Sequence, residues 1–275
     1  MTGSNDKGWI AALPMYDFPE LAAAHDALWG AVAARLTAAG VTELPRELTR
    51  KVAQWDVWRH PRLLLGQGCE YPLIKSCADT IRLVATPCYA VPGCTGSTYR
   101  SAVVVRRADP AEALTDLRYR RCVINDLNSN SGMNLLRAAI APLSWSERFF
   151  ESVTISGAHR RSAEMVANGQ ADVAALDCVS FAHFQRLYPA LLANLRVLCW
   201  TPASPSLPFI TARATNDETL RSLRCALVSV IADSSLAAVR ERLFLDAIDI
   251  EPDDTCCEVL KLERQAAELG YPNLL

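Results

Sequence analysis

Residues 123–137 read VINDLNSNSGMNLLR and carry the clearest structural signal in this chain. A short apolar run ends at Ile124, a turn rich in Asn and Ser follows, and a helical pattern begins near Gly132. A helix start leaves backbone N–H groups unpaired and carries partial positive charge, so it binds tetrahedral oxyanions readily. Ser129 and Ser131 would add hydroxyl donors, and Gly132 would let the backbone approach a ligand. The alternative is that these polar residues only cap the helix.

The overall composition excludes several classes of protein. The chain has 275 residues, of which 51% are hydrophobic and 21% charged, enough for a full core and one or two domains. Its formal net charge is −2, without a basic stripe, which argues against a nucleic-acid partner. Charged residues or prolines interrupt every apolar stretch before it reaches spanning length, so we expect no insertion into a membrane.

The ten cysteines indicate the redox state of the cellular compartment more than they indicate a metal site or a catalytic role. None forms a Cys-x-x-Cys pair, which argues against a zinc ribbon. So many thiols, together with the absence of a visible leader in the polar residues 1–7, predict a cytoplasmic protein for the chain as given. If the chain is exported, one or two bridges among Cys69, Cys77, Cys88 and Cys94 are the alternative. The adjacent Cys256 and Cys257 are interpreted as bystanders, with a vicinal redox or metal role left open.

Strand and helix patterns alternate along the chain. Strands are expected at Trp9–Leu13, Glu47–Val52, Ile81–Thr86, Tyr99–Val105, Cys122–Ile124, Asp172–Leu176 and Leu195–Trp200, and helices at Pro19–Ala39, Asp56–Leu65, Arg160–Asn168 and most of Asn216–Ala247. This alternation predicts an α/β fold with mainly parallel sheets and helices on both faces. Ligands of such folds bind at the carboxyl ends of the strands.

The residues that follow the expected strands are mostly polar or aromatic. They are Tyr16, Asp17, Tyr89, Ser129 to Gly132, His159 and Asp177. Neutral donors, a helix start and one carboxylate suit an oxyanion that keeps a proton, because the carboxylate accepts from P–OH but repels sulfate. No Gly-x-Ser-x-Gly elbow, Walker loop or metal-spaced His/Glu cluster is present, so we expect binding rather than catalysis, with no cofactor or metal.

Several motifs together resemble a known family. They read GCEYPL at 68–73, GCTGSTYRSAV at 93–103, NDLNSNSG at 125–132, GAH at 157–159 and ADVAALD at 171–177. In this order they resemble the phosphate/phosphite/phosphonate-binding proteins of ABC importers, over roughly residues 10–211.

The resemblance implies a two-lobed type 2 periplasmic-binding-protein fold with a ligand cleft between the lobes. One lobe would comprise residues 1–100 plus 201–275, and the other residues 101–200. The implied function is a solute-binding protein for phosphonate, phosphite or phosphate, working with an ABC permease or as a related sensor. It also implies a periplasmic location if a leader was trimmed. The alternative is a cytosolic enzyme on the same fold that acts on a small anionic metabolite.

The resemblance also implies roles for individual residues. Ser129, Asn130, Ser131 and Gly132 would hold the oxyanion, His159, Tyr16 and Tyr99 would donate hydrogen bonds to it, and Asp177 would accept from a protonated ligand oxygen or pair with a ligand amine. Asn130 departs from the hydroxyl residue expected there. Plainer interpretations stay open: His159 as a capping or surface residue, Tyr99 as a packing residue, and Asp177 as the cap of a helix over 178–184.

Overall fold

The computed structural model describes residues 8–144, 148–250 and 258–274, so Cys256 and Cys257 lie outside the described residues. These residues form two compact units. The first unit contains residues 8–69, 73–88 and 207–250, and the second contains residues 70–72, 89–206 and 258–274. The chain passes between the units at residues 88/89 and 206/207, whereas the expected boundaries were near residues 100 and 200. The C-terminal residues 258–274 group with the second unit, whereas the expected division placed them with the first.

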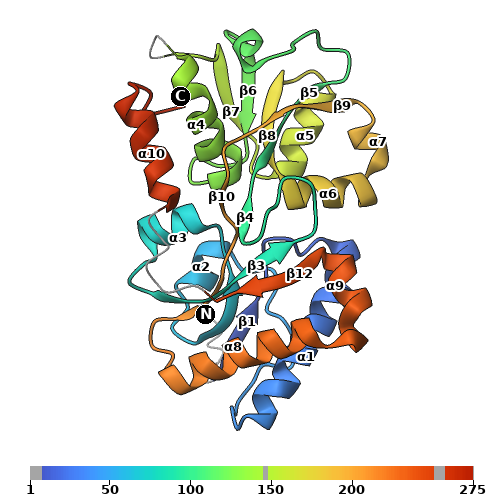
Figure 1. Ribbon diagram of the computed structural model, residues 1–275, viewed down its shortest axis with the longest axis vertical. Helices are drawn as coiled ribbons and strands as arrows, with labels where there is room; N and C mark the ends of the chain where they lie inside the picture. Colours follow the sequence, from blue (N-terminus) through green and yellow to red (C-terminus); the bar gives the residue numbers. More distant parts are fainter. Residues whose placement is uncertain (1–7, 145–147, 251–257, 275) are drawn as a thin grey trace, which may run out of the picture. The chain divides into compact units, whose positions relative to one another are not determined.

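The first unit is built on a five-stranded sheet in the order β1-β2-β11-β3-β12. Its elements are β1 (Ile10–Ala12), α1 (Ala22–Ala38), α2 (Gln54–Trp58), β2 (Leu63–Gln67), residues 73–76 of α3 (Glu70–Ser76), β3 (Ile81–Tyr89), β11 (Phe209–Ala212), α8 (Asp217–Ala232), α9 (Ala237–Leu243) and β12 (Leu245–Asp249) (Figure 1). β1 pairs with β2 in parallel, whereas β11 lies antiparallel to both β2 and β3. The sheet is thus mixed.

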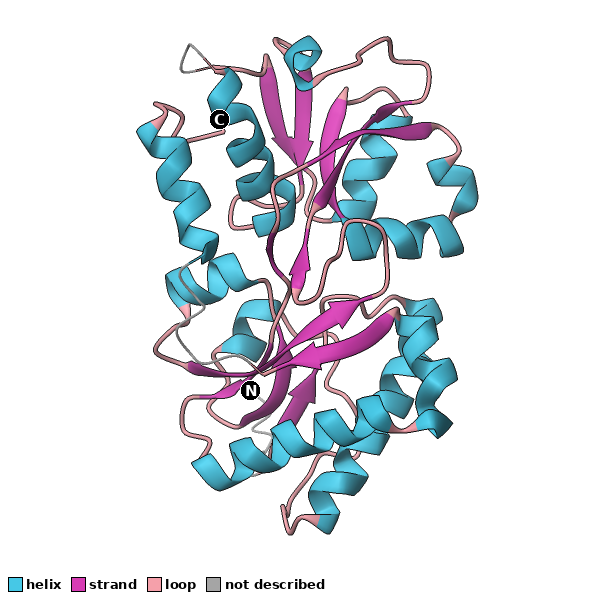
Figure 2. Ribbon diagram, viewed as in Figure 1, coloured by secondary structure: helices cyan, strands magenta, loops and turns pink. Residues whose placement is uncertain are grey.

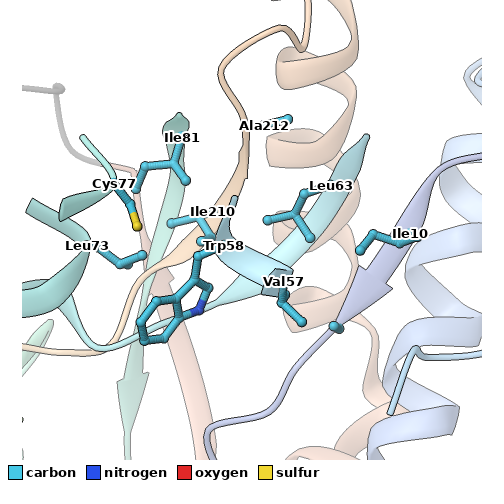
Figure 3. Packing of buried hydrophobic residues seen from close by; sticks show 10 residues of the cluster. Ile10, Val57, Trp58, Leu63, Leu73, Cys77, Ile81, Ile210 and Ala212 are labelled. Carbon is cyan, nitrogen blue, oxygen red and sulfur yellow. The ribbon is translucent and has the colours of Figure 1, made fainter. Parts of the chain in front are cut away.

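Part of this unit's core lies where α2 and α3 meet the sheet, and Figure 3 shows its side chains. Leu63 of β2 and Ile210 of β11 are fully buried there, beside Cys77 just after α3. The Trp58 indole N–H donates to the Gln67 carbonyl at 3.1 Å, which satisfies the buried donor. This cluster anchors the short helices to the strands that precede and follow them.

Two expected elements of this unit are wrong. Residues 56–65 were predicted as one helix, but the structure ends α2 at Trp58 and begins β2 at Leu63. A short apolar run such as Leu63 to Leu65 fits a buried strand and a buried helix equally well, and only tertiary packing separates them. The strand expected at Glu47–Val52 is irregular backbone.

The second unit has its own five-stranded sheet, in the order β7-β6-β8-β5-β9. Its elements are β4 (Thr98–Tyr99), β5 (Ser101–Arg106), β6 (Arg121–Ile124), α4 (Leu135–Ile140), β7 (Ser152–Ile155), α5 (His159–Ala167), β8 (Val173–Asp177), α6 (Cys178–Leu187), α7 (Pro189–Leu192), β9 (Leu195–Trp200), β10 (Ser204–Pro205) and α10 (Glu258–Glu268). β6 runs parallel to β7 and β8, whereas β5 runs antiparallel to β8 and β9. Figure 2 shows helices beside both five-stranded sheets.

This topology decides which residues gather at one edge of the second sheet. β7, β6 and β8 are parallel neighbours, so their carboxyl ends, near Ile155, Ile124 and Asp177, lie at the same edge. β5 runs the other way, so its first residue, Ser101, pairs with Asp177 and belongs to that edge too. Tyr99 stands two residues before Ser101. The described elements therefore bring four separate parts of the chain to this edge.

No single helix among the described residues has the length and apolar composition needed to cross a membrane. By length and composition only, the bent pair Asp217–Ala232 and Ser234–Leu243, with 73° between its members, meets the requirement.

Candidate functional site

The helix that follows β6 begins with a π-helical turn. Ser129 is the N-cap, and its Oγ accepts the Gly132 N–H at 3.0 Å. The residues Asn130–Asn134 form a π-helical turn, in which the Asn134 N–H reaches the Ser129 carbonyl at 3.0 Å, before α4 begins. Such turns are rare and occur frequently at functional sites. The Ser131 N–H has no acceptor among the described residues, so it is available to a ligand.

Ser131 contacts a residue from the neighbouring strand-to-helix turn. Its Oγ lies 2.7 Å from Nε2 of His159, the first residue of α5. Ser129 Oγ lies 3.4 Å from Ser131 Oγ and extends the chain of hydroxyl groups. The turns after β6 and β7 are thus joined through side chains that the sequence predicted as ligand donors.

The histidine in this pair is uncharged at neutral pH. Burial lowers the pKa of His159 to about 4, although a hydrogen bond with the Ala175 backbone acts in the opposite direction. One ring nitrogen therefore carries a proton and the other accepts. The hydrogen bond at Ser131 then joins two neutral groups, and the site gains no cation from His159.

Asn130 is the centre of a buried polar network. Its carboxamide nitrogen donates to the Tyr99 hydroxyl at 3.1 Å and to Ser204 Oγ at 2.8 Å, and its oxygen accepts from Asn134 at 2.8 Å. Asn130 and Tyr99 are each only 1% exposed. Both side chains therefore hold the turn against β4 and β10, an arrangement for which the carboxamide, unlike a hydroxyl, supplies two donors.

The same network continues into the C-terminal helix. Asn134 donates to the Val259 carbonyl at 3.3 Å, and its oxygen accepts from the Arg137 guanidinium at 2.6 Å. Arg137 is 3% exposed and also donates to the Pro272 carbonyl at 2.7 Å. Residues 258–274 thus hold the π-helical turn through hydrogen bonds to Asn134 and Arg137, which explains why they group with the second unit.

Gly132 has a packing role. A Cβ atom built on it would lie 1.8 Å from Oδ1 of Asn125, so only glycine leaves room for this carboxamide. Asn125 Oδ1 is itself buried and has no hydrogen-bond partner among the described residues. Gly132 was expected to let a ligand approach the backbone. In the structure, the space beside its Cα is occupied by the Asn125 carboxamide.

Asp177 and Tyr16 lie in different units. Asp177, 2% exposed, caps α6 by accepting the Ser180 N–H at 2.8 Å, as the plainer interpretation of this residue predicted. Its carboxylate is at the same sheet edge as the turn after β6. Tyr16 is buried in the turn after β1 and belongs to the first unit, so it is not among the residues that the second unit brings together.

Sequence reasoning missed four residues that shape this edge: Asn125, Asn134, Arg137 and Ser204. Asn125 lies within the motif that carried the family resemblance, but its contact with Gly132 has no signature in the sequence. Ser204 lies in a Pro-rich segment that reads as a plain loop. Among the described residues, no group of three or more His, Cys, Asp or Glu side chains is placed to hold a metal ion.

Comparison with known proteins identifies the family. Residues 68–253 match the family model described as "ABC transporter, phosphonate, periplasmic substrate-binding protein". The chain belongs to this family. It is therefore a phosphonate-type substrate-binding protein, a solute-binding component of an ABC importer, as the resemblance implied. The family is periplasmic and works with a small ligand and an ABC permease.

Several solved structures have a similar fold. One is a binding protein component of an ABC phosphonate transporter from Pseudomonas aeruginosa, with 15% identity, a TM-score of 0.75, and coverage of 96% of this chain and 88% of that one. Another is PhnD1 from Prochlorococcus marinus in complex with methylphosphonate, with 13% identity, a TM-score of 0.73, and coverage of 96% and 100%.

A third similar structure is XAC2383 from Xanthomonas citri bound to ATP, with 15% identity, a TM-score of 0.70, and coverage of 96% of this chain and 98% of that one. At these identities the likeness establishes the fold alone. A search of curated protein sequences found no match.

Proposed function

We propose that this substrate-binding protein takes a phosphorus oxyanion at the edge formed by the carboxyl ends of β6, β7 and β8. The Ser131 N–H and the hydroxyls of Ser129 and Ser131 donate to the phosphoryl oxygens, and His159 supports them. The observation that carries this proposal is the Ser131 amide, which has no acceptor among the described residues and lies at the start of a helix.

The contact between Ser131 and His159 fits such a role. When Nε2 of the neutral His159 donates to Ser131 Oγ, the serine hydroxyl hydrogen is free to point at a ligand oxygen. Asn125 Oδ1, buried without a partner beside Gly132, is an acceptor for a protonated oxygen. Tyr99 and Asn130 hold the turn in place. Tyr16 stays a prediction as a phenolic donor.

Asp177 gives the site a preference among oxyanions. Its carboxylate lies at the same edge and accepts a hydrogen bond from a ligand that keeps a proton, or pairs with a ligand amine. A fully ionised sulfate offers neither, so the carboxylate repels it. The proposed ligand class is therefore phosphonate, phosphite or phosphate in a monoprotonated form, released unchanged to the permease.

Melting and calorimetry with a ligand panel test this proposal. The panel contains methylphosphonate, 2-aminoethylphosphonate, phosphite, phosphate, sulfate and ATP, and we expect melting shifts with the phosphorus oxyanions and none with sulfate. Phosphorus NMR of the incubated ligands would show them unaltered. The absence of any shift at millimolar ligand, with turnover of a small anionic metabolite, would favour the alternative of an enzyme on this fold.

A further inference from the structure

Two cysteines that are far apart in the sequence meet in the second unit. Sγ of Cys94 lies 3.4 Å from Sγ of Cys178, and both thiols are free. A disulfide bond joins its sulfurs at about 2.05 Å, so roughly 1.4 Å of approach separates this contact from a covalent bond. None of the bridges considered from the sequence paired these two residues.

Close backbone packing holds the two thiols together. Cys94 lies in the turn that its N–H closes on the Val91 carbonyl at 3.1 Å, and Cys178 is the first residue of α6. Between them, a Cβ atom on Gly93 would lie 2.9 Å from Cβ of Cys178 and 2.7 Å from the Trp200 ring. Gly93 also has a φ of +98°, which favours glycine. The contact is thus built into the fold and does not depend on a mobile side chain.

We propose that Cys94 and Cys178 form a redox-active dithiol, which a small-molecule disulfide such as oxidised glutathione converts into an intramolecular disulfide. This redox reaction does not depend on oxyanion binding. The pair is present as two free thiols in a reducing compartment and as a disulfide in an oxidising compartment, where disulfides form and persist.

The two thiols have different roles in the exchange. Cys94 is partly exposed and meets the oxidant first, whereas Cys178 is 1% exposed. The Cys94 thiolate attacks one sulfur of the small disulfide, which forms a mixed disulfide and releases one thiolate that takes up the Cys94 proton. The Cys178 sulfur then attacks Sγ of Cys94 and displaces the second small thiolate, which takes up the Cys178 proton. Two protein thiols are oxidised, and one small disulfide is reduced to two thiols.

The second step is expected to be the slower one. Contact with Cys94 and burial both raise the pKa of the Cys178 thiol, so little thiolate is present at neutral pH. Once formed, the bond closes a long loop and ties the turn around Gly93 to the first residue of α6, directly after Asp177. Closing so long a loop restricts the unfolded chain and raises the melting temperature by about 5 °C or more.

Oxidation of the full chain with oxidised glutathione tests the proposal. Mass spectrometry of the wild type is expected to show the loss of two hydrogens without a retained glutathionyl group at this pair. Peptide mapping without reductant should join the peptides that contain Cys94 and Cys178, and dithiothreitol should restore the reduced mass and melting temperature.

Variants separate this pair from the other thiols. Cys178→Ala should retain one glutathionyl group on Cys94, and Cys94→Ser should leave Cys178 unmodified. Cys225→Ser, which removes an exposed thiol of the first unit, should still form the bond. A wild type in which Cys94 stops at the mixed disulfide, or is found joined to another cysteine, would overturn the proposal.

Discussion

Ser131 Oγ and His159 Nε2 lie 2.7 Å apart although 28 residues separate them in the sequence. Each residue stands in a turn that follows one of two adjacent parallel strands, β6 and β7. The hydrogen bond therefore joins two turns that are each capable of presenting donors to an anion. Through the Asn130 network the first turn is also attached to β4, β10 and α10.

Replacing the serines at the start of this helix tests the donors directly. We expect Ser129→Ala combined with Ser131→Ala to weaken the affinity for the preferred phosphorus oxyanion at least about tenfold, because two hydrogen bonds to a charged group are lost. Isothermal titration calorimetry measures the change.

Ser235→Ala is the matched control, since it removes an exposed hydroxyl in the first unit. An unchanged dissociation constant in the double variant would exclude both hydroxyls from the site. Ser129→Ala alone also removes a helix cap and should cost about 1 kcal/mol of stability.

Gly132→Ala should destabilise the protein by about 1–3 kcal/mol, because the added methyl group overlaps the Asn125 carboxamide. Adding Asn125→Ala should recover most of this loss by making room. Urea unfolding of the two single variants and the double variant measures the coupling. Gly30→Ala is the control: nothing lies within 4 Å of its added Cβ, so this helix position should gain stability. Additive effects of the Asn125 and Gly132 changes would contradict the steric explanation.

Asp177→Asn separates the two roles of this side chain. Asparagine caps helices about as well as aspartate, so the free energy of unfolding should change by less than about 1 kcal/mol. The loss of negative charge should reduce the preference for monoprotonated phosphonate over sulfate by about tenfold. Competition calorimetry measures this ratio. If the ratio stays at its wild-type value while Asp177→Ala destabilises the protein, Asp177 is a helix cap and nothing more.

Arg137→Met should destabilise the protein by about 2–4 kcal/mol, because the buried Asn134 side-chain oxygen and the Pro272 carbonyl lose their donor. The π-helical turn loses support from α10, so oxyanion affinity should fall as well. Thermal unfolding and calorimetry measure the two effects. Arg161→Met, which removes an exposed ion pair with Glu164, should change stability by less than about 0.5 kcal/mol. Equal effects of the two substitutions would show that burial of Arg137 is unimportant.

The pH dependence of the free energy of unfolding should reveal the protonation of His159. Its pKa is about 4 in the folded protein, against 6.5 for an ordinary histidine, so between these values the unfolded chain binds the extra proton. The contribution of His159 to the free energy of unfolding should therefore fall as the pH drops from 6.5 to 4 and level off below, by at most about 3 kcal/mol.

Urea titrations of the wild type and His159→Gln across this range measure the contribution. The difference between the two proteins isolates His159 from His25, whose pKa burial also lowers. Parallel pH profiles would show that His159 does not stay neutral in the folded protein.

The sequence alone was sufficient to predict the turn after β6 and the alternation of strands and helices, and its resemblance to a known family implied the two α/β units. The turn and the alternation depend on local patterns, because a polar turn between an apolar strand and a helix is specified by adjacent residues. The residues that follow parallel strands were also predictable as a group, since the carboxyl ends of such strands share an edge.

Only the tertiary structure decided which residues meet across the chain. That β11 lies between β2 and β3, and that β5 runs antiparallel to β8, depends on chain topology, which local periodicity does not encode. Asn130 meets Ser204 across 74 residues, and Cys94 meets Cys178 across 84. Such contacts depend on how strands pair and on which side chains are small enough to permit close approach, as Gly132 permits Asn125. For this reason the site could be predicted as a set of donors, whereas the network that holds them in place could not.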